Sequence, residues 1–279
     1  MRRARVSAVQ TTLSYGVLVG LAFVVLFPFY WMTVTSFKNE EQMRSLISMF
    51  WPRPLVGDNY EQLLSKTDFV KWYGNSATVA IASTLLATAV GTIGAYALAR
   101  LRFLGRGFMA SATLITYLVP PSILFIPLYA QMRNLGLANS LGGLIAAYPS
   151  FTVPFVTWLL MGYFESIPEE LEEAAMIDGA TRFGAFYRVV LPLSAPGVLA
   201  AGLYAFTQAW NEFLYALVFI TDGKLRTLPV GLASFITGDV YGWGYLMAGA
   251  VLTTLPVIAA YIYLQKYMVE GLTAGSVKG

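Results

Sequence analysis

The chain has 279 residues, of which 57% are hydrophobic and only 12% are charged, and its mean hydropathy is +0.63. Soluble domains carry about 25% charged residues, so this composition excludes a soluble globular protein and indicates one that lies in membrane lipid. The net charge of +3 gives no reason to expect a nucleic-acid partner.

Cysteine and histidine are both absent from the sequence. Without them the chain cannot form a disulfide, a thiolate nucleophile, an imidazole base or a histidine metal site. A phosphate loop ending in Gly-Lys-Ser or Gly-Lys-Thr is also missing, so we do not expect the chain to hydrolyse ATP. We therefore expect no catalytic residue, no metal site and no cofactor bound by this chain.

Long runs without charged residues divide the sequence, and most of them reach the roughly 20 residues that a helix needs to cross a bilayer. A backbone exposed to lipid must satisfy its own hydrogen bonds, which predicts helices. We expect an all-α membrane protein with one transmembrane domain covering residues 1–279. The expected spans are residues 11–35, 74–99, 107–131, 141–164, 197–220 and 243–265.

Arginines in short loops set the expected orientation, because such residues stay on the cytoplasmic side. Arg2, Arg3 and Arg5 precede the first span, and Arg100, Arg102 and Arg106 follow the second. Both segments should be cytoplasmic, together with the loop at residues 166–192. Six spans then leave the N- and C-termini in the cytoplasm.

Prolines interrupt two of the expected spans. Pro120, Pro121 and Pro127 fall in the third span, and Pro149 and Pro154 fall in the fourth. Proline removes a helical hydrogen bond and is the commonest cause of a sharp kink. We therefore expect neither span to be straight.

The loop at residues 166–192 begins with a helix signal. Ser166 followed by Glu169 predicts a capping box, and Pro168 is acceptable in a first turn. We expect a short helix starting near Ile167 and ending at Gly179, which permits a sharp exit.

A second short helix should complete this loop. Phe183, Phe186, Tyr187 and Val190 recur at helical spacing and predict an apolar stripe. Pro192 should stop the helix. Two short helices at an angle form a projection that could fit a cleft on a soluble partner.

At this loop the chain resembles the permease subunits of ABC importers, which carry the pattern Glu-Ala-Ala, three residues, Gly, nine residues, Ile-x-Leu-Pro. The sequence matches at 173–175, 179 and 189–192, with Val189 in place of isoleucine. The resemblance implies a type I importer permease fold in which this loop is the coupling helix, seated in a cleft of the ATP-binding subunit. The implied coupling residues are Glu172, Glu173, Ala174, Ala175, Asp178, Gly179, Phe186, Leu191 and Pro192.

Further residues are similar to the carbohydrate-uptake branch of that family, which includes the six-span maltose-type permeases. They are Asp178-Gly179-Ala180, the segment Ala-Trp-Asn-Glu-Phe-Leu at 209–214, and the Gly-rich tail at 271–279. The resemblance implies that this cytoplasmic tail reaches the interface between two ATPase subunits. The implied tail contacts are Thr273, Gly275, Ser276 and Lys278.

The fifth expected span contains one carboxylate, Glu212. A charge inside a span is costly and should face a cavity or another helix. With Gln208 and Asn211 it predicts a polar stripe along a translocation path or gate. An equally strong alternative is a structural hydrogen bond between helices.

Two outer segments lie on the opposite side of the expected topology. Residues 36–72 are too polar for a span and should fold against the outer face. The resemblance implies that the loop at 221–241 contacts the binding protein, with Gly231, Ser234, Thr237 and Gly238 as expected docking residues.

The resemblance implies an ATP-driven, binding-protein-dependent sugar importer in the cytoplasmic membrane of a bacterium or archaeon. The implied partners are a second permease, a dimer of ATP-binding subunits that holds ATP and Mg, and an extracytoplasmic sugar-binding protein. Glycerol phosphate, a polyol or another solute remains an alternative cargo. A gradient-driven secondary transporter and a membrane scaffold are alternatives from other classes.

Overall fold

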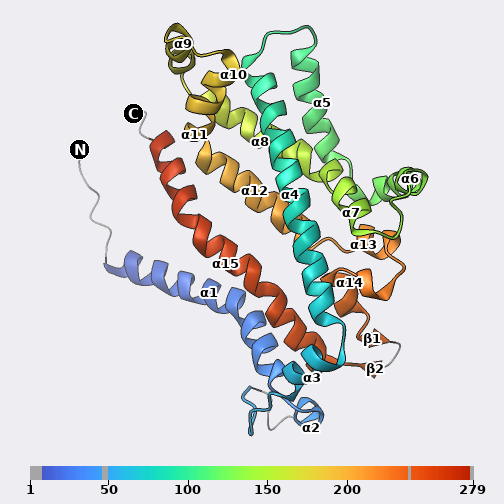
Figure 1. Ribbon diagram of the computed structural model, residues 1–279. Helices are drawn as coiled ribbons and strands as arrows, with labels where there is room; N and C mark the ends of the chain where they lie inside the picture. Colours follow the sequence, from blue (N-terminus) through green and yellow to red (C-terminus); the bar gives the residue numbers. More distant parts are fainter. Residues whose placement is uncertain (1–7, 46–49, 238–239, 277–279) are drawn as a thin grey trace. The chain divides into compact units, whose positions relative to one another are not determined.

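The computed structural model describes residues 8–45, 50–237 and 240–276. Almost all of its regular structure is helical, apart from one antiparallel pair in which Ile236 faces Tyr241 and Thr237 faces Val240 (Figure 1). The expected all-α membrane class is therefore confirmed.

Fifteen α-helices, two shorter helical segments and two strands follow one another in the described ranges. In chain order they are α1 (Ala8–Ser36), α2 (Glu40–Arg44), α3 (Asp58–Lys66), α4 (Phe69–Arg100), α5 (Arg106–Leu118), α6 (Pro121–Asn134), α7 (Leu141–Ala147), α8 (Pro149–Ser166), α9 (Glu169–Ile177), α10 (Arg182–Ala185), the π-helical segment η1 (Phe186–Val190), α11 (Leu191–Leu193), α12 (Ala195–Trp210), α13 (Leu214–Phe219), the 3₁₀ segment η2 (Gly223–Leu225), α14 (Leu228–Ala233), β1 (Ile236–Thr237), β2 (Val240–Tyr241) and α15 (Trp243–Ser276).

Four continuous stretches are long and apolar enough to cross a membrane: Thr11–Ser36, Phe69–Arg100, Leu141–Ser166 and Trp243–Tyr267. Two bent pairs pass the same test, Arg106–Leu118 with Pro121–Asn134 and Arg182–Leu193 with Ala195–Trp210. Counting each bent pair as one span would give six, but Arg182–Leu193 lies in the loop at 166–192 that the sequence places in the cytoplasm. Of the second pair, only Ala195–Trp210 overlaps the fifth expected span. The boundaries of the spans in a bilayer stay predictions.

The third span is bent where its first prolines lie. α5 ends at Leu118, α6 begins at Pro121, and the two helices meet at 99°. Pro120 and Pro121 cannot donate the backbone hydrogen bonds that would continue α5. The expected kink of this span is confirmed.

The fifth span departs from expectation, because residues 197–220 do not form one helix. α12 ends at Trp210 and α13 begins at Leu214. In between, the carboxylate of Glu212 accepts hydrogen bonds from the backbone N–H groups of Tyr215, at 2.8 Å, and Ala216, at 3.1 Å. A side chain that accepts hydrogen bonds from the first N–H groups of a helix stabilises the start of that helix, so Glu212 favours a separate α13 over a continuation of α12.

The chain divides into two compact units. One contains the chain up to Phe69 and Leu232–Leu255, and the other contains Val70–Gly231 and the chain from Pro256 onward. In the first unit, the amide of Asn59 donates to the carbonyls of Ser36, at 2.9 Å, and Lys38, at 2.7 Å. These bonds hold α3 against the end of α1.

The second unit has a core built from α4, α8, η1 and α12. Its buried members are Ala87, Ala95, Tyr96, Ala99, Val156, Leu160, Phe164, Phe186, Val190, Ala201 and Ala205. Small residues on α4 and α12 allow close helix packing. A Cβ added to Gly91 would lie 2.5 Å from Val156 Cγ1, so α4 and α8 approach closely there.

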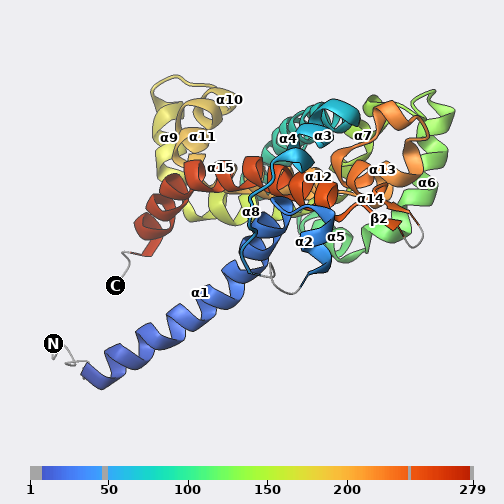
Figure 2. The ribbon, with the colours of Figure 1, turned by 90° about the horizontal axis from the view of Figure 1, so that it is seen from below.

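Within this second unit, α9, α10 and α11 gather at one end, near the point where α4 stops at Arg100. α6, α13 and α14 lie toward the other end (Figures 1 and 2). The loop that carries the sequence motif therefore lies beside the end of a membrane-length helix.

Candidate functional site

The first helix of the motif loop starts without the expected capping box. α9 begins at Glu169 after Pro168, and no side chain caps it. The hydroxyl of Ser166 instead donates to the carbonyl of Tyr163 at 2.7 Å. Serine commonly bonds back to the preceding turn of its own helix, so Ser166 finishes α8 and the capping-box prediction is wrong.

The end of α9 follows the prediction. Gly179 has φ +91°, and Ala180 N donates to the carbonyl of Ala175 at 3.0 Å. Glycine adopts this left-handed conformation without steric cost. The chain then turns, and Thr181 caps α10 by accepting a hydrogen bond from Gly184 N at 3.1 Å.

The second helix of the loop does not stop at Pro192. It runs from α10 through η1 into α11 and ends at Leu193. Pro192 lies in the first turn of α11, where its missing N–H costs no hydrogen bond. The π-helical turn η1 lies immediately before this position, and its backbone hydrogen bonds span five residues in place of four.

Only half of the predicted apolar stripe in this helix is buried. Phe186 and Val190 belong to the core of the second unit, while Phe183 is 72% exposed and Tyr187 is 64% exposed. The Phe186 ring lies 4.4 Å from the ring of Tyr96, measured between centroids. The loop is thus joined to α4 through its second half.

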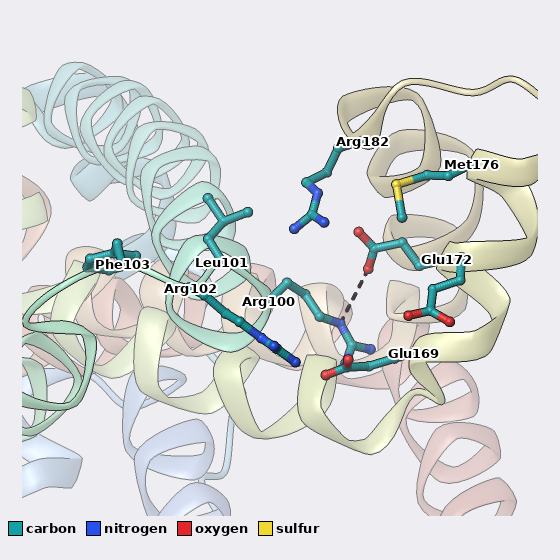
Figure 3. A pocket seen from close by; sticks show the side chains of 9 residues that line it. Arg100, Leu101, Arg102, Phe103, Glu169, Glu172, Met176 and Arg182 are labelled. Atoms are coloured by element: carbon teal, nitrogen blue, oxygen red, sulfur yellow. Dashed lines mark hydrogen bonds and ion pairs between the residues drawn. The ribbon is translucent and has the colours of Figure 1, made fainter.

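A buried carboxylate joins the first half of the loop to α4. Glu172 accepts a hydrogen bond from the hydroxyl of Tyr96. Its Oε2 lies 3.4 Å from Arg100 Nε, as the dashed line in Figure 3 marks. The side chain of Arg100 is 5% exposed and that of Glu172 is 7% exposed. Arg100 Nη2 also donates to the carbonyl of Ile167 at 2.6 Å.

The expected coupling residues fall into two groups. Glu173, Ala174, Asp178, Gly179 and Pro192 are exposed, Ala175 and Leu191 are half-buried, and Glu172 and Phe186 are buried. The exposed group is available to a partner. Glu172 and Phe186 face their own chain, which gives them a supporting role that the motif alone did not indicate.

A pocket of ≈ 690 Å³ separates the end of α4 from α9. Figure 3 shows its lining side chains, which are Arg100, Leu101, Arg102, Phe103, Glu169, Glu172, Glu173, Met176 and Arg182. Charged groups of both signs line it, and none is a cysteine, serine or histidine that could act as a nucleophile or base.

Sequence reasoning missed Tyr96 and Arg100 as members of this site. They lie 76 and 72 positions before Glu172. The one available signal was their position, four residues apart at the end of a span, which places them on one helix face.

The residues expected along the translocation path are held by local hydrogen bonds. Gln208 Nε2 donates to the hydroxyl of Tyr204 at 3.3 Å, and Asn211 Nδ2 donates to the carbonyl of Thr207 at 2.8 Å. The hydroxyl of Tyr148, at the junction of α7 and α8, donates to Glu212 Oε2 at 3.0 Å. The alternative of a structural bond between helices is therefore present, and a path role for these residues stays a prediction.

One expected docking residue, Gly231, lies inside the fold, and a docking role for it stays a prediction. Gly231 is buried in α14, and a Cβ there would overlap the ring of Trp72. Its lack of a side chain allows the indole to lie against α14, so Gly231 serves packing. Ser234 is exposed, Thr237 lies in β1, and Gly238 falls outside the described residues.

The expected tail contacts lie at the end of the chain. Thr273, Gly275 and Ser276 belong to the last turns of α15, and Lys278 falls outside the described residues.

A family model described as the inner membrane component of binding-protein-dependent transport systems matches residues 87–273. The chain is 41% identical over 254 residues to the sulfoquinovosyl glycerol transport system permease protein SmoH of Agrobacterium fabrum, covering 91% of this chain and 89% of that one. It is 37% identical over 268 residues to the trehalose/maltose transport system permease protein MalG of Thermococcus litoralis, covering 93% and 94%.

Among solved structures, a chain of a bacterial ABC transporter that imports the acidic polysaccharide alginate has a TM-score of 0.80 to this one. The two are 24% identical, and the match covers 96% of this chain and 99% of the other. The likeness shows a shared fold over nearly the whole chain.

Proposed function

Because the chain belongs to the family of inner membrane components of binding-protein-dependent transport systems, we propose that it forms half of the translocation pathway of an ATP-driven importer for sugars or glycosides. One observation carries this proposal: α9 presents Glu173 and Ala174 outward while buried contacts join it to a membrane-length helix. A soluble motor could push on such a helix. The names of the two relatives support a glycosidic cargo, in preference to glycerol phosphate or a polyol.

The energy comes from partner subunits in this proposal. A dimer of ATP-binding subunits holds ATP and Mg and contacts the exposed coupling residues Glu173, Ala174, Asp178 and Gly179 together with the half-buried Ala175. Thr273, Gly275, Ser276 and Lys278 of the tail reach the interface between the two ATPases. The absence of a phosphate loop in this sequence supports a separate ATPase.

A second, related permease completes the pathway. Of the apolar window in Thr11–Ser36, only 6% is buried within this chain. Such a helix requires lipid or another membrane protein around it. This exposure supports an assembly in the membrane.

The motif loop and both termini lie in the cytoplasm of a bacterium or archaeon. Arg102, which belongs to the arginine-rich loop after α4, lines the same pocket as Glu173 of α9. Because arginine-rich short loops stay cytoplasmic, this proximity supports a cytoplasmic α9. The sugar-binding protein then docks on the opposite side, at Ser234, Thr237 and Gly238.

Transport follows alternating access. Binding of ATP closes the ATPase dimer, the exposed face of α9 receives that movement, and the outer gate opens toward the docked binding protein. Gln208, Asn211 and Glu212 border the path between the two gates. The chain itself performs no covalent chemistry.

Reconstitution tests this function. The chain is co-purified with its partner subunits, placed in lipid vesicles, and supplied with ATP, binding protein and labelled trehalose, maltose or a glyceryl glycoside. We expect ATP hydrolysis to rise when both binding protein and its sugar are present, with sugar accumulating inside. Uptake that needs a proton or sodium gradient and no ATP would contradict the proposal.

A further inference from the structure

Three buried side chains, Tyr96, Arg100 and Glu172, join α9 to α4, and we call them the α9 anchor. We propose that the α9 anchor makes α9 and the end of α4 move as one body, so that Arg100, Tyr96 and Glu172 are positioning residues for energy coupling. This inference rests on the proposed function, which supplies the force on α9. The inference adds that α4 receives the force and that the α9 anchor transmits it from α9.

The guanidinium of Arg100 holds the loop at two separate points. Nη2 donates to the carbonyl of Ile167, just before α9, and Nε forms an ion pair, without a hydrogen bond, 3.4 Å from the carboxylate of Glu172 in the middle of α9. Two attachment points on a rigid planar group restrict both the position and the direction of α9. Lysine has a single charged nitrogen and cannot span both points in this way.

Tyr96 completes the anchor from the same face of α4, one turn before Arg100. Its hydroxyl donates to Glu172, and its ring packs on Phe186 and lies 6.3 Å from Phe164 of α8, measured between centroids. One side chain therefore connects the carboxylate of α9 with the aromatic core of the second unit.

Apolar packing does not replace these polar contacts along α9. Leu171 is 46% exposed and Ile177 is 86% exposed. The ion pair between Arg100 and Glu169 contributes little, because the Glu169 side chain is 63% exposed and water screens its charge. Buried charges that lose their partner are strongly destabilised, so the Arg100–Glu172 pair favours one arrangement of the two helices.

A matched pair of substitutions tests the transmission. Arg100→Lys and Arg102→Lys make the same chemical change two residues apart, but Arg102 forms neither a hydrogen bond nor an ion pair with Glu172 or Ile167, both of which are described residues. In the reconstituted complex we expect Arg100→Lys to lower the sugar transported per ATP hydrolysed about tenfold. Arg102→Lys should leave that ratio unchanged. An assembled Arg100→Lys complex with the parent ratio would overturn the proposal.

A distance measurement tests the same idea without transport. The chain contains no cysteine, so Leu104→Cys and Ile177→Cys, at positions 103% and 86% exposed, introduce two unique sites for spin labels. We expect the distance between the labels to be the same in nucleotide-free and ATP-trapped complexes. Adding Glu172→Gln, or the milder Tyr96→Phe, should make that distance change on ATP binding.

The two experiments separate failure of the anchor from failure of the proposed function. If the labelled complex without Glu172→Gln or Tyr96→Phe imports sugar but its distance between labels changes on ATP binding, the α9 anchor proposal is wrong and the proposed function stands. If the distance between labels stays constant on ATP binding but the complex moves no sugar, the proposed cargo is wrong and the α9 anchor proposal stands. If Arg100→Lys prevents assembly, the spin-label comparison with Tyr96→Phe still decides the question.

Discussion

Two neighbouring glutamates in α9 have different surroundings. Glu172 is buried against Tyr96 and Arg100, while Glu173 is exposed at the rim of the pocket. The sequence alone does not tell which of the two is buried, because neighbouring residues of an α-helix differ only by a rotation of about 100° around the helix axis. The surrounding chain decides which carboxylate supports the fold and which remains available.

Alanine at these two positions should therefore have different effects. Glu172→Ala removes the buried carboxylate partner of Arg100 and leaves that guanidinium only the exposed Glu169 and the carbonyl of Ile167, so we expect a loss of up to roughly 3 kcal/mol in stability. Glu173→Ala should change stability by less than about 0.5 kcal/mol but weaken recovery of the ATPase subunits. Thermal unfolding and co-purification measure the two effects. Equal unfolding temperatures for the two variants would contradict this assignment.

Gly179 is required by backbone conformation. Alanine there would be held at φ +91°, a region that side chains disfavour, and we expect a loss of about 1 to 3 kcal/mol. Gly162→Ala is the control, because Gly162 lies inside α8 with open space around its Cα. We expect that substitution to be neutral or stabilising. The two unfolding temperatures are compared in the same detergent.

At the scale of elements, breaks between helices carry the site. α12 gives way to α13 where Glu212 caps the new helix, and η1 leads into α11 at the proline that was expected to end the segment. In both places a side chain or a changed hydrogen-bond pattern competes with a continuous α-helix. Periodicity alone does not reveal such competition.

Glu212→Ala removes the acceptor for two backbone N–H groups at the start of α13. We expect about 1 kcal/mol of lost stability, as for other helix caps. If Glu212 also borders the path, transport per assembled complex should fall as well, and Glu212→Gln should preserve more of it. Normal transport by the Glu212→Ala complex would remove Glu212 from the path and leave it only the structural role.

Packing of α14 on α4 depends on Gly231. Gly231→Ala places a Cβ within the ring of Trp72, and we expect overpacking to lower stability by about 1 to 3 kcal/mol. Gly223→Ala is the control, since Gly223 has open space around it in the preceding segment. A stable Gly231→Ala protein that fails to bind the binding protein would instead restore Gly231 to the docking surface.

At the scale of the whole molecule, topology can be tested directly in a chain without cysteine. Ile177→Cys should be cytoplasmic and Leu55→Cys external, and both positions are well exposed. An impermeant maleimide added to intact spheroplasts should label Leu55→Cys alone and reach Ile177→Cys only after permeabilisation. The reverse pattern would invert the orientation that the arginine-rich loops predict.

The sequence by itself determined the class of protein and the place of the motif loop. Charge-free runs of membrane length predict helices because lipid offers no hydrogen-bond partner to the backbone. The Glu-Ala-Ala pattern, with Gly179 as the exit of α9, depends on local conformation and could be found without a structure.

Only the tertiary structure decided which side chains of that loop face the fold. The contact of Tyr96 and Arg100 with Glu172 joins residues more than 70 positions apart, and no local pattern encodes such a distance. Likewise, the hydroxyl of Ser166 bonds to the helix behind it, and Gly231 lies under Trp72. These outcomes follow from how α4, α8, α12 and α14 pack, because burial depends on neighbours that are remote in the sequence.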